Sequence, residues 1–219
     1  MATIKGQQQS VNILVNHSRR DIDIVDSQQM SPLHHACDKG HVEVVKELLR
    51  VSTKSIDTLD HQQRSPLHHA CNNGHVEVVK ELLRVSTKSI DALDHQQRSP
   101  LHYACGTGHV EVVKELLRVS TKSIDTLDHQ QMSPLHQACD KGPVEVVKEL
   151  LRVSTKSIDS PDHHQKSPLH HACGTGHVEV VKELLRVSTK SIDTLDHQQM
   201  SPLHYACDKG PVELSLIHI

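Results

Sequence analysis

Serine, histidine, cysteine and aspartate occur together in this chain in groups that could serve a catalytic or metal site. The stretch SPLHHACDKGHVEVVKELL, from Ser31 to Leu49, brings all four residue types close together. A serine beside a histidine and an acid is the constellation of nucleophilic hydrolases, and histidine with cysteine is a ligand set for zinc. Whether either chemistry is possible depends on how these residues are spaced.

The same residues return at a constant interval. The tetrapeptide SPLH begins at positions 34 residues apart, at Ser31, Ser65, Ser99, Ser133, Ser167 and Ser201. Nucleophilic catalysis needs one exposed, strained serine with an oxyanion site, whereas here the same Ser and His are copied on short predicted helices. We therefore expect no catalytic residue among them, even where Asp60, Ser65 and His68 imitate a triad. The chain is predicted not to be an enzyme.

The cysteines and motif histidines also occupy one position each in successive copies. These residues are Cys37, Cys71, Cys105, Cys139, Cys173 and Cys207, with His34, His68, His102, His136, His170 and His204. Packed helices lie about 8 to 10 Å apart, whereas disulfide-bonded Cα atoms lie within about 7 Å and zinc ligands within about 2.0 to 2.3 Å of the metal. We expect buried, unpaired cysteines, no metal site and no cofactor.

Each copy is predicted to contain two short helices joined by a tight turn. In the second copy Ser65 caps the first helix, Pro66 begins it and Gly74 ends it. The predicted apolar faces are Leu67, Ala70 and Cys71 in the first helix and Val76, Val79, Leu82 and Leu83 in the second. Helices shorter than about 12 to 15 residues are marginal alone, so the copies must stack into a solenoid in which each unit contacts its neighbours.

The pattern D-x-x-x-x-S-P-L-H-x-A-C-x-x-G-H-V-E-V-V-K-E-L-L closely resembles the ankyrin repeat, from Asp26 to about Glu213. The resemblance implies an all-α repeat solenoid, a curved stack of helix-turn-helix units with projecting β-hairpin loops and a concave partner-binding surface. The units begin at Asp26, Asp60, Asp94, Asp128, Asp162 and Asp196, and the last is incomplete. Glutamine stands at the loop tip, at Gln63 and Gln97, where the family usually has glycine. Because glutamine resists φ > 0, we expect a distorted tip or a different turn type.

The two ends depart from the repeat. Residues 1–25 are interpreted as a degraded leading half-repeat or amino-terminal cap, because Gly6, Val11 and Leu14 lie 34 positions before Gly40, Val45 and Leu48. A start of the chain at Met1 as a gene-model fragment fits equally well. Residues 214–219, LSLIHI, break the pattern of residues 26–213. One reverse translation of them looks like a transposon-end sequencing adaptor, so we interpret them as non-native read-through.

Composition restricts the partners. The formal charge is -3, from 24 basic and 27 acidic residues, and Tyr103 and Tyr205 are the only aromatic residues of the Phe, Trp and Tyr class. Nucleic-acid binding is disfavoured, because it needs a basic footprint and stacking platforms. No stretch reaches the roughly 18 to 20 apolar residues of a membrane span. We expect no membrane insertion by this segment and a cytoplasmic location, with the nucleus as the alternative; the oligomeric state is left open.

Differences between the copies gather at the loop tip, on the first helix and in the turn between the helices. The candidate partner-binding residues are the tip residues Arg64, Arg98, Met132 and Lys166 and the first-helix residues His69, Tyr103, Gln137, His171 and Tyr205. In the resembling family these positions line the concave face. Tyrosine and arginine dominate interface energetics, so Tyr103, Tyr205, Arg64 and Arg98 are the predicted hot spots. Recent duplication of blocks explains the pattern of differences as well as a binding groove with a cationic middle does.

The sequence thus favours a protein-interaction scaffold whose partner protein it does not identify. The alternative is the recognition segment of a larger enzyme, ubiquitin-ligase adaptor or membrane channel whose active part lies outside this sequence. A reading frame that continues beyond Glu213 would favour the alternative.

Overall fold

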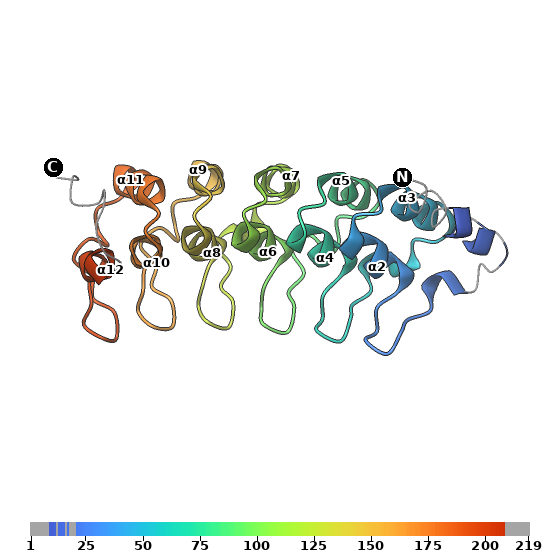
Figure 1. The fold of residues 1–219 in the computed structure, drawn as a ribbon, viewed down its shortest axis with the longest axis horizontal. Helices are drawn as coiled ribbons and strands as arrows, with labels where there is room; N and C mark the ends of the chain where they lie inside the picture. Colours follow the sequence, from blue (N-terminus) through green and yellow to red (C-terminus); the bar gives the residue numbers. More distant parts are fainter. Residues whose placement is uncertain (1–8, 12, 16, 18–20, 209–219) are drawn as a thin grey trace.

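The computed structural model describes residues 9–11, 13–15, 17 and 21–208 of the 219-residue chain. Within these residues, helix pairs stack side by side in one elongated row, with a loop projecting from each unit (Figure 1). The first helices of the units are α2 (Pro32–Lys39), α4 (Pro66–Asn72), α6 (Pro100–Thr107), α8 (Pro134–Lys141), α10 (Pro168–Thr175) and α12 (Pro202–Asp208). The second helices are α3 (Val42–Val51), α5 (Val76–Val85), α7 (Val110–Val119), α9 (Val144–Val153) and α11 (Val178–Val187). Short 3-10 turns are η1 (Asp21–Asp23), η2 (Lys54–Asp57) and η3 (Lys122–Asp125).

The first helices are terminated as the sequence predicts. In α6, the side chain of Ser99 accepts the backbone N–H of His102, and Pro100 is the first helical residue. Gly108 follows the helix with φ 79°, a left-handed conformation that glycine adopts without a Cβ clash. The helix α4 differs slightly, because it ends at Asn72 and is capped by Asn73 before Gly74.

The second helices share the sequence VEVVKELLRV, and they bury a wider face than the predicted one. In α5 the predicted residues Val79 and Leu82 are fully buried, and Val76 and Leu83 are half-buried and packed against the core. Val78, which the prediction did not include, is also fully buried. The helix α5 packs against α4 of its own unit and also against α3 and α7 of the neighbouring units. A pattern based on one packing surface does not capture this second direction of contact.

The core runs through the stack without interruption. Each first helix contacts the first helices before and after it, and the buried Leu, Ala and Cys of one unit meet those of the next. Cys71, Cys105 and Cys139 are completely buried, and the described cysteines are unpaired, as expected. The expectation of burial is wrong at Cys207, which is exposed because the structure places no following unit against α12 within the described residues.

The projecting loops are closed by hydrogen bonds without any strand in residues 21–208. In the second unit the backbone N–H of Asp60 donates to Arg64 (2.9 Å), and that of Gln63 donates to Asp60 (2.9 Å). Each loop also joins its neighbour, since the N–H of His61 donates to the carbonyl of Gln28 (3.0 Å). These bonds hold Gln63 at φ 61°. The expectation that glutamine avoids φ > 0 at the tip is therefore wrong.

The leading segment is helical at residues 9–11, 13–15 and 17, and Val15 is buried. These residues lie one repeat length before α3, so they occupy the place of a second helix of a preceding unit. The assignment of residues 1–25 as a cap stays a prediction. Residues 214–219 lie outside the described residues, as does the end of the last unit. Among the described helices, none combines the length and hydropathy required to cross a membrane.

Candidate functional site

The repeated Ser–His pair is a structural brace between units. The backbone N–H of Ser65 donates to Nδ1 of His68 (3.1 Å), so this nitrogen is an acceptor and the proton sits on Nε2. Nε2–H then donates to the carbonyl oxygen of Arg98 in the next loop (3.3 Å). One neutral imidazole thus accepts the backbone N–H at the start of a helix in its own unit and donates to a backbone carbonyl in the loop of the next unit.

Burial fixes the charge state of these histidines. It lowers the pKa of His68 and of His102 to about 4, because the imidazolium form loses its hydration inside the stack. Burial also raises the pKa of the Cys105 thiol far above its ordinary range, which removes the thiolate that nucleophilic chemistry requires. Within the described residues, no group of His, Cys, Asp and Glu is arranged to hold a metal ion.

The residues predicted to contact a partner form one row along the stack, which we call the variable row. It consists of Arg64, Arg98, Met132, Lys166, His69, Tyr103, Gln137, His171 and Tyr205. Each unit's aspartate links its tip residue and its first-helix residue. In the second unit, Asp60 accepts hydrogen bonds from the guanidinium of Arg64 (3.0 Å) and from Nε2 of His69 (2.9 Å).

The third unit carries the most elaborate version of this arrangement. The hydroxyl of Tyr103 donates to Asp94 (2.7 Å), and the guanidinium of Arg98 donates to the same hydroxyl (2.7 Å). The guanidinium carbon of Arg98 also lies 4.5 Å from the centre of the Tyr103 ring, within cation–π range. Burial and the Asp94 carboxylate raise the pKa of Tyr103 to about 12. Arg98 and Tyr103 are therefore held rigidly, with the charge of Arg98 matched by that of Asp94.

The other members of the variable row contribute unequal surface. His69 is 5% exposed and Met132 is 9% exposed, so these two predicted contact residues offer a partner little area. Gln137 donates to Asp128 (3.3 Å) and is half-buried. Lys166 lies 4.6 Å from the ring of Tyr205, which pairs a cation with an aromatic side chain for a second time along the row.

The turn of one unit reaches the first helix of the next, a relationship the sequence analysis did not identify. Nδ1 of His69 lies 3.6 Å from Asp38 of the preceding unit, and Nδ1 of His171 lies 3.8 Å from Asp140. The turn also lies against the next first helix elsewhere, since a Cβ added at Gly174 would lie 3.4 Å from the ring of Tyr205, an ordinary van der Waals distance. The signal was present in the sequence as an aspartate in the turn followed, one unit later, by histidine.

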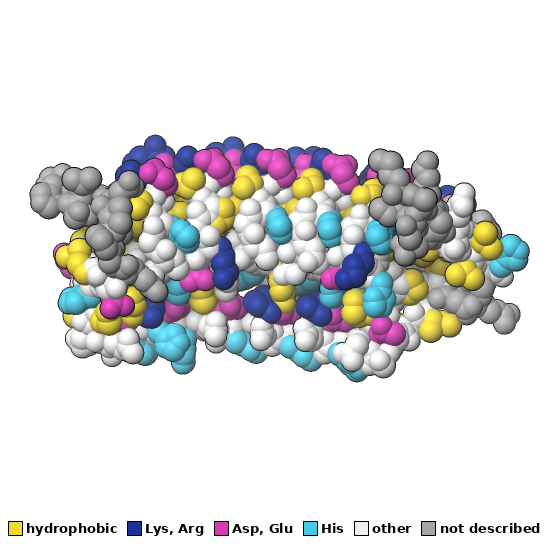
Figure 2. Space-filling view, viewed as in Figure 1, with side chains coloured by type: hydrophobic (Ala, Val, Ile, Leu, Met, Phe, Trp, Pro, Cys, Tyr) yellow, Lys and Arg dark blue, Asp and Glu magenta, His cyan; other side chains and the backbone are white. Residues whose placement is uncertain are grey.

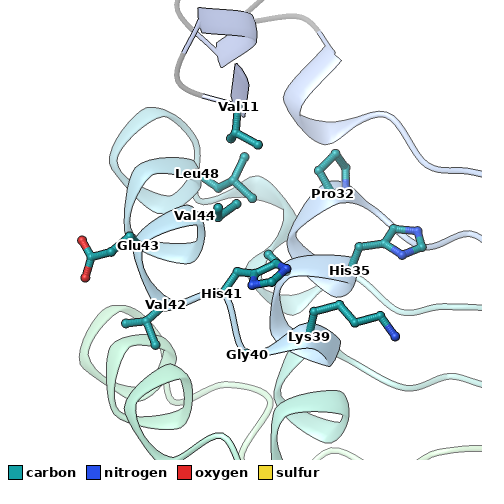
Figure 3. A pocket seen from close by; sticks show the side chains of 11 residues that line it. Val11, Pro32, His35, Lys39, Gly40, His41, Val42, Glu43, Val44 and Leu48 are labelled. Atoms are coloured by element: carbon teal, nitrogen blue, oxygen red, sulfur yellow. The ribbon is translucent and has the colours of Figure 1, made fainter. Parts of the chain in front are cut away.

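A cavity of about 690 Å³ opens beside α2 at the amino-terminal end of the stack. Its lining includes Pro32, His35, His41 and Leu48, with Val11 from the leading segment. Figure 3 shows Val11 on the side of Leu48 and Val44, and Pro32, His35 and Lys39 along α2. The lining is mainly apolar, and the sequence analysis did not predict a cavity here.

Basic side chains, histidines and ion pairs occupy different parts of the surface of the stack. Figure 2 shows basic side chains spaced along the middle of one face, histidines at the loop tips along its lower edge, and mixed acidic and basic side chains along the second helices at its upper edge. The upper row consists of ion pairs within one helix, such as Lys114 with Glu111 (2.8 Å) and Arg118 with Glu115 (3.0 Å). Such exposed pairs contribute about 0 to 1 kcal/mol each.

Comparison with known proteins agrees with this geometry. The family model described as "Ankyrin repeats (3 copies)" matches residues 1–94, 85–162 and 154–216. Among solved structures, the crystal structure of the human ASB11 ankyrin repeat domain superposes with a TM-score of 0.84 and 30% sequence identity, covering 99% of this chain and 94% of that one. No curated protein sequence matches the chain.

Proposed function

The chain belongs to the ankyrin repeat family, and from this premise we propose that it binds a partner protein through the variable row and the loop tips beside it. Ankyrin repeats are protein–protein interaction modules, and the fold is a non-catalytic scaffold. The face and the residues that make the contact are the substance of the proposal.

The observation that carries the proposal is where the units differ. The second helices keep one sequence, VEVVKELLRV, in every unit where they are described, whereas the tip and first-helix positions change from unit to unit. The packing of the stack does not dictate which residue stands at these positions. A histidine hydrogen-bonds to Asp60 and to Asp162, whereas a tyrosine makes the same bond to the equivalent Asp94. Varied side chains on a constant scaffold give a surface that can distinguish partners.

The chemistry of the row suits a mixed polar and aromatic contact. Arg98 and Tyr103 are fixed before binding, which reduces the side-chain entropy lost on association. The row extends over several units and can supply the roughly 800 Å² per partner of an ordinary specific interface.

The test changes the recognition surface while keeping the bonds to the aspartates. Tyr103→His copies the arrangement of His69 on Asp60, and Arg98→Lys keeps a cation beside Asp94. Proteins retained by the immobilised wild-type chain from cell extract are identified by mass spectrometry, and the affinity of a purified candidate is then measured by calorimetry. We expect the double variant to bind it at least about tenfold more weakly, equivalent to about 1.4 kcal/mol.

Lys114→Ala serves as the matched control, because Lys114 lies in the same unit on the opposite, second-helix edge and is exposed. It should bind like the wild-type chain. Equal affinity of the wild-type chain and the double variant, with both folded by circular dichroism, would show that the variable row is not the contact.

A further inference from the structure

A cavity of about 560 Å³ lies between the loops that follow α9 and α11, at the junction of the fourth and fifth units. The loop after α9 contributes Thr155, Lys156 and Asp159 to its lining, and the loop after α11 contributes Ser188 and Lys190. No residue of the variable row lines it. The charged side chains of this cavity therefore come from two neighbouring units.

Thr155 has the accessible hydroxyl of the loop after α9. The hydroxyl of Ser154 donates to Asp125 (2.7 Å) and accepts the backbone N–H two residues further on (3.2 Å). Ser157 is buried and also donates to Asp125 (2.6 Å), and Ser160 donates to a carbonyl of the same loop (3.3 Å). The side chain of Thr155 is exposed and, within the part of the chain that the structure describes, its hydroxyl makes no hydrogen bond. An enzyme that modifies hydroxyl groups therefore meets Thr155 first.

Basic residues flank Thr155 on both sides. Arg152 lies three positions before it with a side chain that is 75% exposed, and Lys156 follows it directly and is exposed as well. The helix α9 ends at Val153, and Ser154 is extended (φ -146°, ψ 141°), so Thr155 lies outside the helix. Protein kinases select substrates by their charge pattern, and carboxylates in the substrate cleft can recognise an arginine shortly before the hydroxyl. The segment has the exposure and the charge that suit a kinase for basic substrates.

The cavity also offers cations to a phosphate on this loop. Lys156 and Lys190 are exposed, and among the described residues neither ammonium group has a carboxylate partner. Asp159, the acidic residue of the lining, already accepts the hydroxyls of Ser188 (2.7 Å) and Ser191 (2.6 Å). A phosphate monoester carries a charge of about -1.5 to -2 at pH 7 and forms charge-assisted hydrogen bonds with lysine. Of the two lysines, Lys190 is the one that belongs to the following unit.

We propose that Thr155 is a phosphorylation site for a protein kinase that prefers basic substrates, and that the phosphate binds Lys190 and so joins the fourth and fifth units. In the transfer, Oγ1 of Thr155 attacks the γ-phosphorus of ATP and forms a new P–O bond, while the bond from that phosphorus to the oxygen shared with the β-phosphate breaks. ADP leaves, and the hydroxyl proton passes to a base of the kinase. The same sequence, R-V-S-T-K, surrounds the equivalent threonines Thr53, Thr87, Thr121 and Thr189.

The first experiment isolates Thr155 in the full 219-residue chain. The Thr155-only chain carries the substitutions Thr53→Ala, Thr87→Ala, Thr121→Ala and Thr189→Ala. It is incubated with ATP and the catalytic subunit of cAMP-dependent protein kinase, and tandem mass spectrometry locates the phosphate. We expect a single phosphate, on Thr155, and its loss when Thr155→Ala is added. A peptide of residues 149–159, in which Ser154 is not held by Asp125, is treated in parallel.

Urea denaturation of the Thr155-only chain before and after phosphorylation tests the contact with Lys190. Phosphorylation should raise the ratio of folded to unfolded chain at a fixed urea concentration about three- to fivefold, the range of an exposed ion pair. With Lys190→Gln the chain should be phosphorylated equally but gain nothing. Lys88→Gln is the matched control, because Lys88 is the exposed equivalent of Lys190 in a distant unit; the full gain should remain.

Phosphate on Ser154 in place of Thr155 overturns the assignment of the site. A folded chain without phosphate overturns it too: if the peptide is modified, the fold hides the hydroxyl, and if it is not, the sequence is no kinase substrate. Absence of stabilisation, or equal stabilisation with Lys190→Gln, overturns the contact between units. Neither measurement involves a partner on the variable row, so both results are independent of the function proposed above.

Discussion

Nε2 of His34 lies 3.2 Å from the carbonyl oxygen of Arg64, thirty residues further along the chain. Nδ1 of the same ring accepts the N–H of Ser31 (3.1 Å), so both nitrogens are engaged with backbone and the imidazole must be neutral. The arrangement recurs at His68, His102 and His170. Protonation of Nδ1 would remove an acceptor from each brace and bury a charge, which has a direct consequence for stability.

We expect the stack to lose stability steeply as the pH falls below about 6.5. Burial lowers the pKa of His34, His68, His102 and His136 to about 4, so between about pH 6.5 and 4 the unfolded chain binds protons that the folded chain does not. Each such proton contributes about 1.4 kcal/mol per pH unit, hence about 5 kcal/mol per pH unit for the four at most. Urea midpoints measured from pH 7.5 to 5 should fall accordingly; constant midpoints would contradict the assignment.

His102→Ala should lower the free energy of unfolding by about 3 kcal/mol, since it opens a cavity and leaves the Ser99 N–H and the Met132 carbonyl without their partner. His204→Ala is the matched control, because His204 makes the same bond to Ser201 in an exposed setting. Measured by urea denaturation, it should cost less than about 1 kcal/mol. Equal losses at the two sites would refute a bracing role.

Gln97→Gly should stabilise the protein by about 1 kcal/mol, because Gln97 has φ 62° and glycine occupies that region without a Cβ penalty. Gln96→Gly, one residue earlier and not at positive φ, should instead cost about 0.5 to 1 kcal/mol through added backbone freedom in the unfolded chain. Thermal denaturation of the two variants provides the comparison. A destabilised Gln97→Gly would mean that the glutamine side chain has a favourable role at the tip.

Asp140 and His171 should show coupling that disappears at alkaline pH. Burial opposes protonation of His171, but hydrogen bonds to Asp140 and Asp162 raise its pKa above the ordinary value. The stabilisation is therefore complete below about pH 6.5 and is lost as the pH rises through the raised pKa. The substitutions Asp140→Gly and His171→Gln reproduce the Gly106 and Gln137 pair of the preceding junction. A double-mutant cycle with these two substitutions should give a coupling free energy of unfolding of about 1 kcal/mol at pH 6 and almost none at pH 9. Coupling independent of pH would exclude the ion pair.

Local features of the fold were predictable from the sequence because they depend on neighbouring residues. The order of Ser65, Pro66 and Leu67 predicts a capped helix by itself. The constant repeat length then predicts that the helix pairs stack. The burial of Val78 in the second helix was missed, since packing against two neighbouring units is a tertiary effect. The conformation of Gln63 was missed because loop-to-loop hydrogen bonds override its intrinsic preference.

For the candidate site, the sequence suggested which residues to consider but not how they are held. Variation between units singled out the residues of the variable row as candidates, yet it did not indicate that Asp60 would accept hydrogen bonds from both Arg64 and His69 or that His69 would be buried. The cavity beside α2 was missed for the same reason, because it is bounded by segments whose distance is set by the fold.

The constancy of the second helices also bears on how such a chain changes length. Removing residues 94–127, one full unit, would bring α4 next to α8 with the helix faces and the register of the stack unchanged. The cost would fall on a single new junction, where Asn72, the equivalent of Asp38, would face Gln137 in place of Tyr103. Unequal recombination between near-identical units can therefore lengthen or shorten the protein in whole steps, and the turn and first-helix pairs decide which rearranged orders remain well packed.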